Sequence, residues 1–184
     1  MKLMIASDIH GSDTYCEKML EAFAREGAER LLLLGDILYH GPRNDLPDGY
    51  APKKVIERLN SVKQKLLCVR GNCDTEVDQM VLEFPILADY SIICMGGRAI
   101  YATHGHVYNE DKLPPLMSGD ILLYGHTHIP KHSENNGVVC INPGSVSIPK
   151  NGSCHSYLVC DDSDGRLSFV WKRLDGDEYM SLII

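Results

Sequence analysis

The stretch LLLLGD at residues 31–36 decides the fold, because four consecutive apolar residues end abruptly in a glycine and a carboxylate. An apolar run without polar alternation is typical of a strand that is covered on both faces. Shorter apolar runs lie on either side of it, at residues 3–6 and 66–69. We therefore expect three neighbouring strands in the first third of the protein.

Two segments whose apolar residues recur with the period of an α-helix separate these strands. Ser12 or Asp13 is positioned to cap a helix that Gly27 would end. The apolar face of this helix is predicted to comprise Cys16, Met19, Leu20, Phe23 and Ala24. After a loop rich in proline and glycine at residues 41–52, a second helix would present Val55, Ile56, Leu59 and Val62. Strands that alternate with helices predict a parallel sheet.

The remainder of the chain is predicted to consist of short strands and turns. A hairpin is expected around Gly96 and Gly97, with arms at residues 90–95 and 98–103. Further strands are expected at residues 121–124, 138–141, 157–160 and 167–171. Residues 111–116 suggest a helical turn that two prolines shorten, and residues 161–165 suggest a β-turn rather than a calcium loop. No linker or repeat divides the chain, so residues 1–184 are predicted to form a single domain.

Composition narrows the class of protein. Of the 184 residues, 44% are hydrophobic, which excludes a disordered chain, and the formal net charge of −7 disfavours a basic face for long nucleic acids. Seven cysteines are scattered without a C-x-x-C pair, as expected of thiols in a reducing cytoplasm. The first apolar run meets Ser7 and Asp8 too early for a secretion signal, and no run approaches the roughly 20 residues of a membrane helix.

Polar residues with metal-binding chemistry recur where the predicted strands end. They are Asp8 and His10, Asp36, Asn72, His104, and the pair His126 and His128. Each of them alone is ordinary, as a helix cap, a turn residue or a hydrogen-bonded loop imidazole. Ligands of open α/β sheets, however, bind beyond the carboxyl ends of the strands. Recurrence at five successive strand ends therefore favours one shared site.

The chemistry that suits this donor set is a pair of metal ions. Imidazoles, carboxylates and an amide oxygen, without a thiolate, are typical ligands of Mn²⁺, Fe, Co²⁺ or Zn²⁺ in open coordination. Two ions about 3.5–4 Å apart require a ligand short enough to bridge them, and an aspartate at a strand end meets that need.

These motifs resemble those of the calcineurin-like metallophosphoesterases over residues 3–145. The family pattern D-x-H, G-D, G-N-H-D/E, H and G-H-x-H has counterparts at residues 8–10, 35–36, 71–74, 104 and 125–128. The resemblance implies an α/β fold, a four-layer α/β/β/α sandwich of two mixed β-sheets flanked by helices, with two divalent metal ions at the strand ends. Mn²⁺ is the expected ion, with Fe, Co, Ni and Zn as alternatives.

Position by position, the resemblance also implies the ligand sets. Asp8, His10 and His128 would hold the first ion. Asn72, His104 and His126 would hold the second, and Asp36 would bridge both. The implied reaction is phosphodiester hydrolysis by a hydroxide that the two ions activate between them, on small or exposed phosphodiesters and on aryl diesters in vitro.

The sequence departs from the family pattern at Cys73, where relatives often carry a histidine that serves as general acid or phosphate contact. A thiol donates a proton poorly to a departing alkoxide, which favours diesters with good leaving groups. We predict Asp36, Asn72, Cys73 and His40 as catalytic residues, the last three of them also binding substrate. His40 lies where many relatives have an arginine after the G-D motif. His106 remains open between a supporting and a structural role.

Partners and alternatives follow from the same residues. Loops at residues 38–52 and 106–117 would form walls for the alcohol portion of a small-molecule phosphodiester, and neither long nucleic acid nor a membrane is expected as partner. Apolar C-terminal residues 182–184 would allow pairing into a homo-oligomer. The alternatives are a phosphomonoesterase, a nuclease and a non-catalytic scaffold on the same fold. The scaffold is disfavoured because no predicted ligand is lost.

Overall fold

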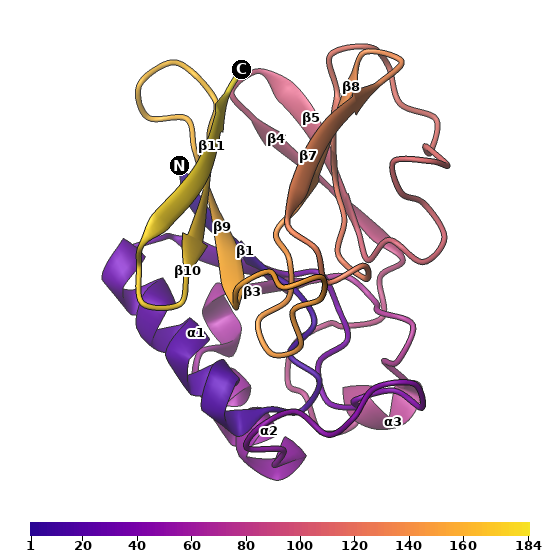
Figure 1. Ribbon diagram of the computed structural model, residues 1–184, viewed down its shortest axis with the longest axis vertical. Coiled ribbons are helices and arrows are strands. Elements are labelled where there is room, and N and C mark those ends of the chain that lie inside the picture. Colours follow the sequence, from indigo (N-terminus) through magenta and orange to yellow (C-terminus); the bar gives the residue numbers. More distant parts are fainter.

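The computed structural model describes all 184 residues and contains two mixed β-sheets (Figure 1). The six-stranded sheet, ordered β11-β10-β9-β1-β2-β3, is made of β1 (Lys2–Ala6), β2 (Arg30–Leu33), β3 (Leu66–Cys68), β9 (Ser156–Asp161), β10 (Ser168–Arg173) and β11 (Glu178–Ile183). The five-stranded sheet, ordered β4-β5-β6-β8-β7, is made of β4 (Tyr90–Met95), β5 (Arg98–Thr103), β6 (Ile121–Leu123), β7 (Lys131–Asn135) and β8 (Val138–Asn142). The predicted α/β class with two mixed sheets is confirmed.

Parallel pairing places the ends of the relevant strands together. β1 pairs in parallel with β2, and β2 with β3, as the alternation of strands and helices predicted. In the other sheet, β5 pairs in parallel with β6. β4 and β5 form the predicted antiparallel hairpin around Gly96 and Gly97. The loops that follow β1, β2, β3, β5 and β6 therefore leave their sheets at carboxyl ends.

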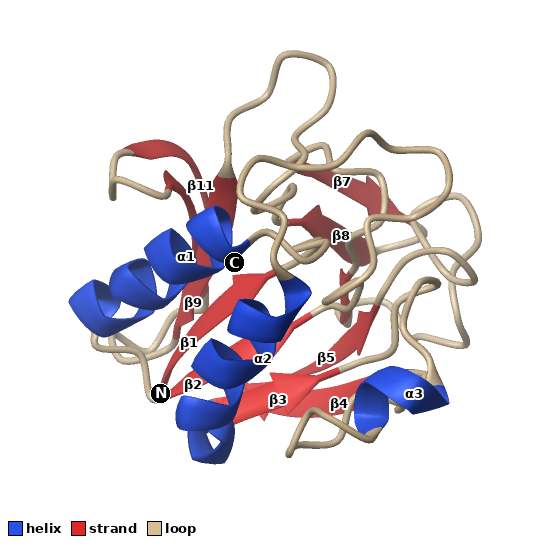
Figure 2. Cartoon of the chain, turned by 90° about the horizontal axis from the view of Figure 1, so that it is seen from below, coloured by secondary structure: helices blue, strands red, loops and turns tan.

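Two helices cover the outer face of the six-stranded sheet (Figure 2). α1 (Asp13–Glu26) begins at Ser12, whose side chain accepts a hydrogen bond from the Tyr15 N–H, and ends at Gly27 in the left-handed conformation. α2 (Pro52–Ser61) begins with proline at its first position, where no intrahelical hydrogen bond is lost. Both helices were predicted, although the buried face of α1 includes Ala22 whereas Ala24 is exposed.

The four leucines at residues 31–34 explain the layering. Leu31 and Leu33 belong to the core between the helices and the six-stranded sheet. Leu32 and Leu34 belong to the core between the two sheets, which also contains Trp171. Since successive side chains of a strand point to opposite faces, one apolar run supplies both cores.

The outer face of the five-stranded sheet carries a loop, residues 104–120, instead of a helix. The predicted helical turn at residues 111–116 is wrong. Asn109 Oδ1 accepts hydrogen bonds from the N–H groups of Asp111 and Lys112, which holds the chain in a turn. Leu113 and Leu116 still pack on the sheet, so the loop covers part of that face.

Several short elements were not predicted. β7 is polar, and it pairs with β8 through a turn at Asn136 and Gly137, both with positive φ. β11, expected only as an exposed apolar strand that ends at residues 182–184, forms one edge of the six-stranded sheet. A four-residue helix, α3 (Glu76–Gln79), and the 3₁₀ turn η1 (Lys63–Lys65) complete the chain. None of the helices combines the length and hydrophobicity that crossing a bilayer requires.

Candidate metal centre

The seven side chains predicted as ligands, here called the metal-ligand cluster, meet beyond the strand ends; they are Asp8, His10, Asp36, Asn72, His104, His126 and His128. Asp8 Oδ1 lies 3.6 Å from His10 Nε2 and 3.3 Å from His128 Nε2. Asp36 Oδ2 lies 3.7 Å from His10 Nε2 and 3.4 Å from His104 Nε2. Asp36 thus lies between two groups of ligand atoms.

The second group surrounds His104. Asn72 Oδ1 lies 3.0 Å from His104 Nε2, and His126 Nδ1 lies 3.2 Å from the same nitrogen. The grouping therefore follows the predicted division, with Asp8, His10 and His128 on one side of Asp36 and these three residues on the other. Which ion each group holds stays a prediction.

Three imidazoles are turned so that the same nitrogen faces the cluster. His10, His104 and His128 place Nδ1 at 2.7 Å, 2.7 Å and 2.6 Å from a backbone carbonyl oxygen each, of Tyr39, Leu34 and Ile148 respectively. A carbonyl can only accept, so Nδ1 carries the hydrogen in each ring. The lone pair of Nε2 is therefore available to a cation, the arrangement found around metal-binding histidines.

The backbone of the cluster is strained. Asp8, His10, Asp36, His126 and His128 all have φ between 50° and 66°, in the left-handed region. Residues with a side chain adopt this region at a cost of about 1–3 kcal/mol each, and such strain concentrates at functional sites. Five strained residues in one cluster indicate that the fold holds these side chains in place at the expense of stability.

An unpaired carboxylate oxygen supports the fit of a cation. Asp8 is fully buried, and its Oδ2 accepts a hydrogen bond from the His126 N–H at 3.1 Å. Its Oδ1 is buried without a hydrogen-bond partner and faces the imidazole nitrogens of His10 and His128. A buried carboxylate oxygen without a donor is unfavourable unless a cation neutralises it. The donor set and this oxygen both fit a divalent ion.

Asp74 ties the loops after β2 and β3 together. Its carboxylate accepts hydrogen bonds from the N–H groups of Asp36, Ile37 and Gly71, at 2.9 Å, 2.9 Å and 2.7 Å. The Cys73 N–H donates to Asp36 Oδ1 at 2.8 Å in return. Sequence reasoning placed Asp74 in the G-N-x-D motif without this positioning role, because nothing in the motif shows which amides a carboxylate will accept from.

The charges of the cluster are interdependent. Burial by itself raises the pKa of Asp8, but the neighbouring His10 and His128 rings outweigh burial and hold that pKa well below its usual value. Burial lowers the pKa of His104, but the Asp36 and Asp8 carboxylates raise it to about 9. Burial and the adjacent His104 lower the pKa of His126 to about 4. Protons and divalent cations would therefore compete for the same nitrogen atoms.

A pocket of about 360 Å³ opens over the cluster. Cys73 lines it, and its thiol sulfur lies within 4.8 Å of ligand atoms of His10 and Asp36. Burial, then the Asp36 carboxylate, raises the pKa of Cys73 to about 12, so the thiol keeps its proton at neutral pH. Arg43 and Lys150, both exposed, also line the pocket and bring positive charge to its rim. Lys150 was missed by sequence reasoning because it follows no strand end.

His40 and His106 lie apart from this pocket. The His40 ring packs edge-on against Tyr50 at 5.3 Å between ring centroids, and its Nδ1 is buried without a partner. His40 does not line the pocket, so the structure does not bring it together with the other predicted substrate contacts. The His106 ring lies 5.4 Å from the His104 ring and 6.2 Å from the His126 ring, and borders a second, larger cavity.

Known proteins resemble this chain in sequence and in fold. The family model of the calcineurin-like phosphoesterase superfamily domain matches residues 1–165. Phosphodiesterase YfcE of Escherichia coli K12 is 53% identical over 162 residues, which cover 88% of each chain. The solved structure of the E. coli YfcE phosphoesterase matches with a TM-score of 0.93 at 48% identity, covering 99% of this chain and 98% of that one. The Vps29 structure from Chaetomium thermophilum, at 16% identity, a TM-score of 0.66, and coverage of 100% of this chain and 97% of that one, shares the fold alone.

Proposed function

Because the chain belongs to the calcineurin-like phosphoesterase superfamily, a family of hydrolases, we propose that it is a metal-dependent phosphodiesterase acting on small or exposed phosphodiesters. Aryl diesters are its proposed substrates in vitro. The similar E. coli protein is named a phosphodiesterase, which supports the reaction class.

One observation carries the proposal. Asp36 Oδ2 lies within 3.7 Å of His10 Nε2 and within 3.4 Å of His104 Nε2, nitrogens that belong to two different groups of ligand atoms. A single carboxylate that reaches both groups is what a pair of adjacent ions requires. We therefore propose two divalent ions, with Mn²⁺ as the expected metal and Fe, Co, Ni and Zn as alternatives. Such ions, when bound, supply an activated water and neutralise charge on phosphate oxygens.

The residues of the chain would position the phosphodiester rather than react with it covalently. Asn72 is exposed and lines the pocket, so its amide would contact a phosphate oxygen. The Cys73 thiol, with its raised pKa, is a weak proton donor at the same rim. Weak acid assistance favours esters whose alcohol departs readily, such as aryl esters.

The proposal also covers the cellular compartment and the binding partners of the protein. All seven cysteines are free, which supports a reducing cytoplasm. The net charge of −7 supports a small-molecule phosphodiester as partner over long nucleic acids or anionic membranes. The exposed edge strand β11, with Ile183 61% exposed, supports a homo-oligomer formed by strand pairing.

A phosphomonoesterase is the second candidate, favoured by Arg43 and Lys150 at the pocket rim. These cations would offset the second negative charge of a monoester. The test is hydrolysis of bis-p-nitrophenyl phosphate and p-nitrophenyl phosphate by protein loaded with Mn²⁺, with metal content measured by mass spectrometry. We expect diester turnover to exceed monoester turnover and two ions per chain. Faster turnover of the monoester than of the diester would favour the second candidate. If protein with its full content of Mn²⁺ hydrolysed neither ester, the scaffold would be favoured.

A further inference from the structure

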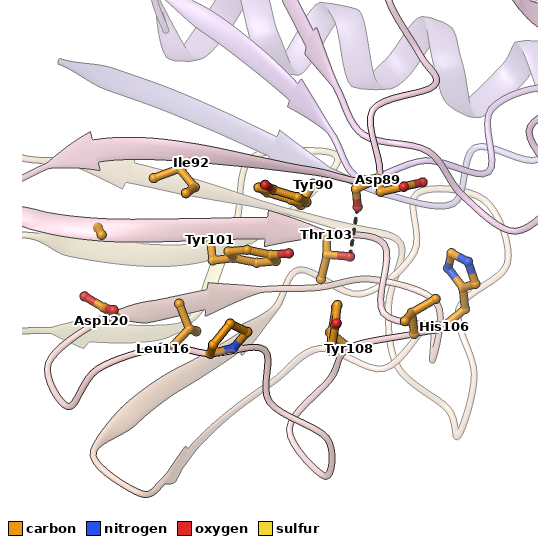
Figure 3. A pocket seen from close by; sticks show the side chains of 12 residues that line it. Asp89, Tyr90, Ile92, Tyr101, Thr103, His106, Tyr108, Leu116 and Asp120 are labelled. Atoms are coloured by element: carbon orange, nitrogen blue, oxygen red, sulfur yellow. Dashed lines mark hydrogen bonds between the residues drawn. The ribbon is translucent and has the colours of Figure 1, made fainter.

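The second cavity is a groove of about 680 Å³ on the outer face of the five-stranded sheet (Figure 3). We call it the aromatic groove; its lining residues include Tyr90, Ile92, Tyr101, His106, Tyr108 and Leu116. Figure 3 shows Ile92 and Asp120 toward one end of the groove and His106 at the other. The groove therefore runs along β4 and β5 toward the loop that holds His104.

The groove exists because no helix covers this face. Leu113 and Leu116 of the overlying loop pack on the cluster around Leu122 and Tyr124. On β4, by contrast, Tyr90 is 52% exposed and Ile92 is 59% exposed. Burying such apolar surface against a ligand is favourable. The part of the sheet face around Tyr90 and Ile92 is therefore a candidate binding surface for an apolar group.

The aromatic side chains fit a flat ligand. Tyr90 and Tyr101 stack with ring centroids 4.8 Å apart and an interplanar angle of 12°. Tyr108 meets Tyr101 edge-on, at 6.4 Å and 90°. Tyr101 is buried beneath this stack, whereas the half-exposed Tyr90 ring is a surface on which another aromatic ring can pack by face or by edge, the two favourable arrangements.

Charge selects against an anionic occupant. Asp89 and Asp120 line the groove, and no lysine or arginine does. Lys112 lies nearby, with its Nζ 5.7 Å from the Tyr108 ring centroid, but the groove itself is lined by the two carboxylates, so an added anion would meet like charge there. The occupant that fits is an uncharged ring, and its negative phosphate must lie elsewhere.

The metal-ligand cluster lies at the end of the groove where that phosphate would be. His106 borders the groove, and its ring is 5.4 Å from the ring of His104 and 6.2 Å from that of His126. A ligand whose ring lies on Tyr90 and Tyr108 can therefore extend past His106 toward the cluster. The groove and the pocket over the cluster share no lining residue, but His106 of the groove and His126 of the pocket have ring centroids only 6.2 Å apart, so one ligand could reach both.

We propose that the aromatic groove binds the flat, uncharged ring of the ester arm that stays on phosphorus, so that the preferred substrates are phosphodiesters of an aromatic alcohol or a nucleoside. This inference rests on the proposed phosphodiesterase function. The retained arm is assigned to the groove because Cys73, proposed above as the proton donor to the departing alcohol, lines the pocket over the cluster and not the groove.

The test holds the leaving group constant and varies the retained arm. The substrates are p-nitrophenyl phosphodiesters that carry a methyl, phenyl or 5′-thymidine group as the second ester. In the wild-type protein we expect kcat/KM for the phenyl or thymidine ester to exceed that for the methyl ester about 10- to 100-fold, from burial of one ring. The phenyl and thymidine arms distinguish a general aryl site from a nucleoside site.

Matched variants locate the effect. The double variant Tyr90→Ala/Ile92→Ala should bring the ratio of ring ester to methyl ester close to 1 while leaving methyl ester turnover unchanged. Met80→Ala, which also removes an exposed apolar side chain, is the control; Met80 is 84% exposed and lies outside the groove. It should keep the wild-type ratio. Calorimetry of phenyl phosphate and methyl phosphate should show the same preference for the ring, lost only in the groove variant.

Three results would overturn the inference. One is a wild-type ratio near 1, and another is an unchanged ratio in the groove variant that still melts at the wild-type temperature. The third is a change of oligomeric state in that variant, measured by light scattering, which would assign the groove to a second copy of the chain. In each case, continued hydrolysis of the methyl ester by wild-type protein leaves the proposed function intact.

Discussion

The metal-ligand cluster and the aromatic groove adjoin each other yet are built on opposite principles. In the cluster, Asp8, His10 and His104 are almost completely buried, and hydrogen bonds to backbone groups hold each of them in place. In the groove, Tyr90 and Ile92 are more than half exposed, and what faces a ligand is mainly side-chain surface. The proposed hydrolysis requires the ligand atoms of the cluster to stay in one position. The proposed selectivity for a ring requires only that the ligand cover the side-chain surface of the groove.

This difference predicts how each region responds to substitution. Changes in the cluster should affect every substrate, because they alter the reacting centre. Changes in the groove should affect only substrates with a ring, because they remove contact area.

Asp36→Asn should have the largest effect. It removes the charge of the one carboxylate that reaches both groups of ligand atoms. We expect kcat/KM to fall about 10³-fold or more for ring and methyl esters alike, and the fold to persist in circular dichroism. Metal content should fall as well. Near-native turnover by this variant with Mn²⁺ supplied, in a preparation free of wild-type protein, would refute the bridging assignment.

Gly71→Ala should come next. A Cβ at Gly71 would lie 2.2 Å from the Asp36 N atom and 2.2 Å from its Oδ1, so the ligand loop must move. Overpacking of this kind costs about 1–3 kcal/mol of stability, and we expect activity to fall about 100-fold through displacement of Asp36.

Gly97→Ala is its matched control, in the β4–β5 hairpin that supports the groove. A Cβ at Gly97 meets no atom within 4 Å, although its φ of +73° disfavours a side chain. We expect a loss of about 1 kcal/mol in the free energy of unfolding, measured with urea, and unchanged kcat. Equal activity losses in the two variants would mean that the glycine at residue 71 has no special role.

The contrast between the regions also explains what the sequence could predict. That the seven predicted ligands lie together could be predicted because each follows an apolar strand, and parallel pairing brings such strand ends together. The groove was found only in part. Residues 106–117 were predicted as a wall, but Tyr90 and Ile92 were assigned only to a strand. Their exposure depends on the absence of a covering helix, which is a property of the distant loop and not of their own sequence.

Other misses have a similar cause. The polar strand β7 lacks the apolar pattern of a strand and exists because β8 pairs with it. The role of Asp74 depends on three amides from two different loops. His40, predicted as a substrate contact from its place after the G-D motif, packs against Tyr50 outside the pocket, and its role stays a prediction. Local patterns predicted elements well, but not contacts that several loops make jointly.

Metal removal should change how stability depends on pH. In protein treated with a chelator, burial lowers the pKa of His104, but the nearby carboxylates outweigh burial and raise that pKa to about 9. The stability that protonated His104 contributes is therefore fully present below pH 6.5 and is lost as pH rises through about 9. The pKa of His126, lowered to about 4, has the opposite effect, and stability falls as pH decreases from 6.5 toward 4. We expect a maximum of the melting temperature near pH 6.5 with chelator, and a shift of that maximum to higher pH with Mn²⁺.

Thermal unfolding monitored from pH 4 to pH 9.5, with and without chelator, tests this expectation. The groove variant Tyr90→Ala/Ile92→Ala should show both profiles unchanged, since none of its altered residues faces the cluster. Identical profiles with and without metal would mean that the cluster binds no ion over this range.

Among the variants expected to alter activity, Cys73→His should give the smallest change, and it is the sharpest test of the division between the regions. The Cys73 thiol keeps its proton, whereas an imidazole at the same rim would donate a proton or carry positive charge near pH 7. We expect the ratio of p-nitrophenyl phosphate to bis-p-nitrophenyl phosphate turnover to rise about 3- to 10-fold, at the lower end of what a positioned acid contributes. The preference for a ring over a methyl group on the retained arm should not change, because the groove is untouched. If that preference falls together with the change in monoester turnover, the cluster and the groove are not independent, and the pocket near Cys73 helps to hold the retained arm.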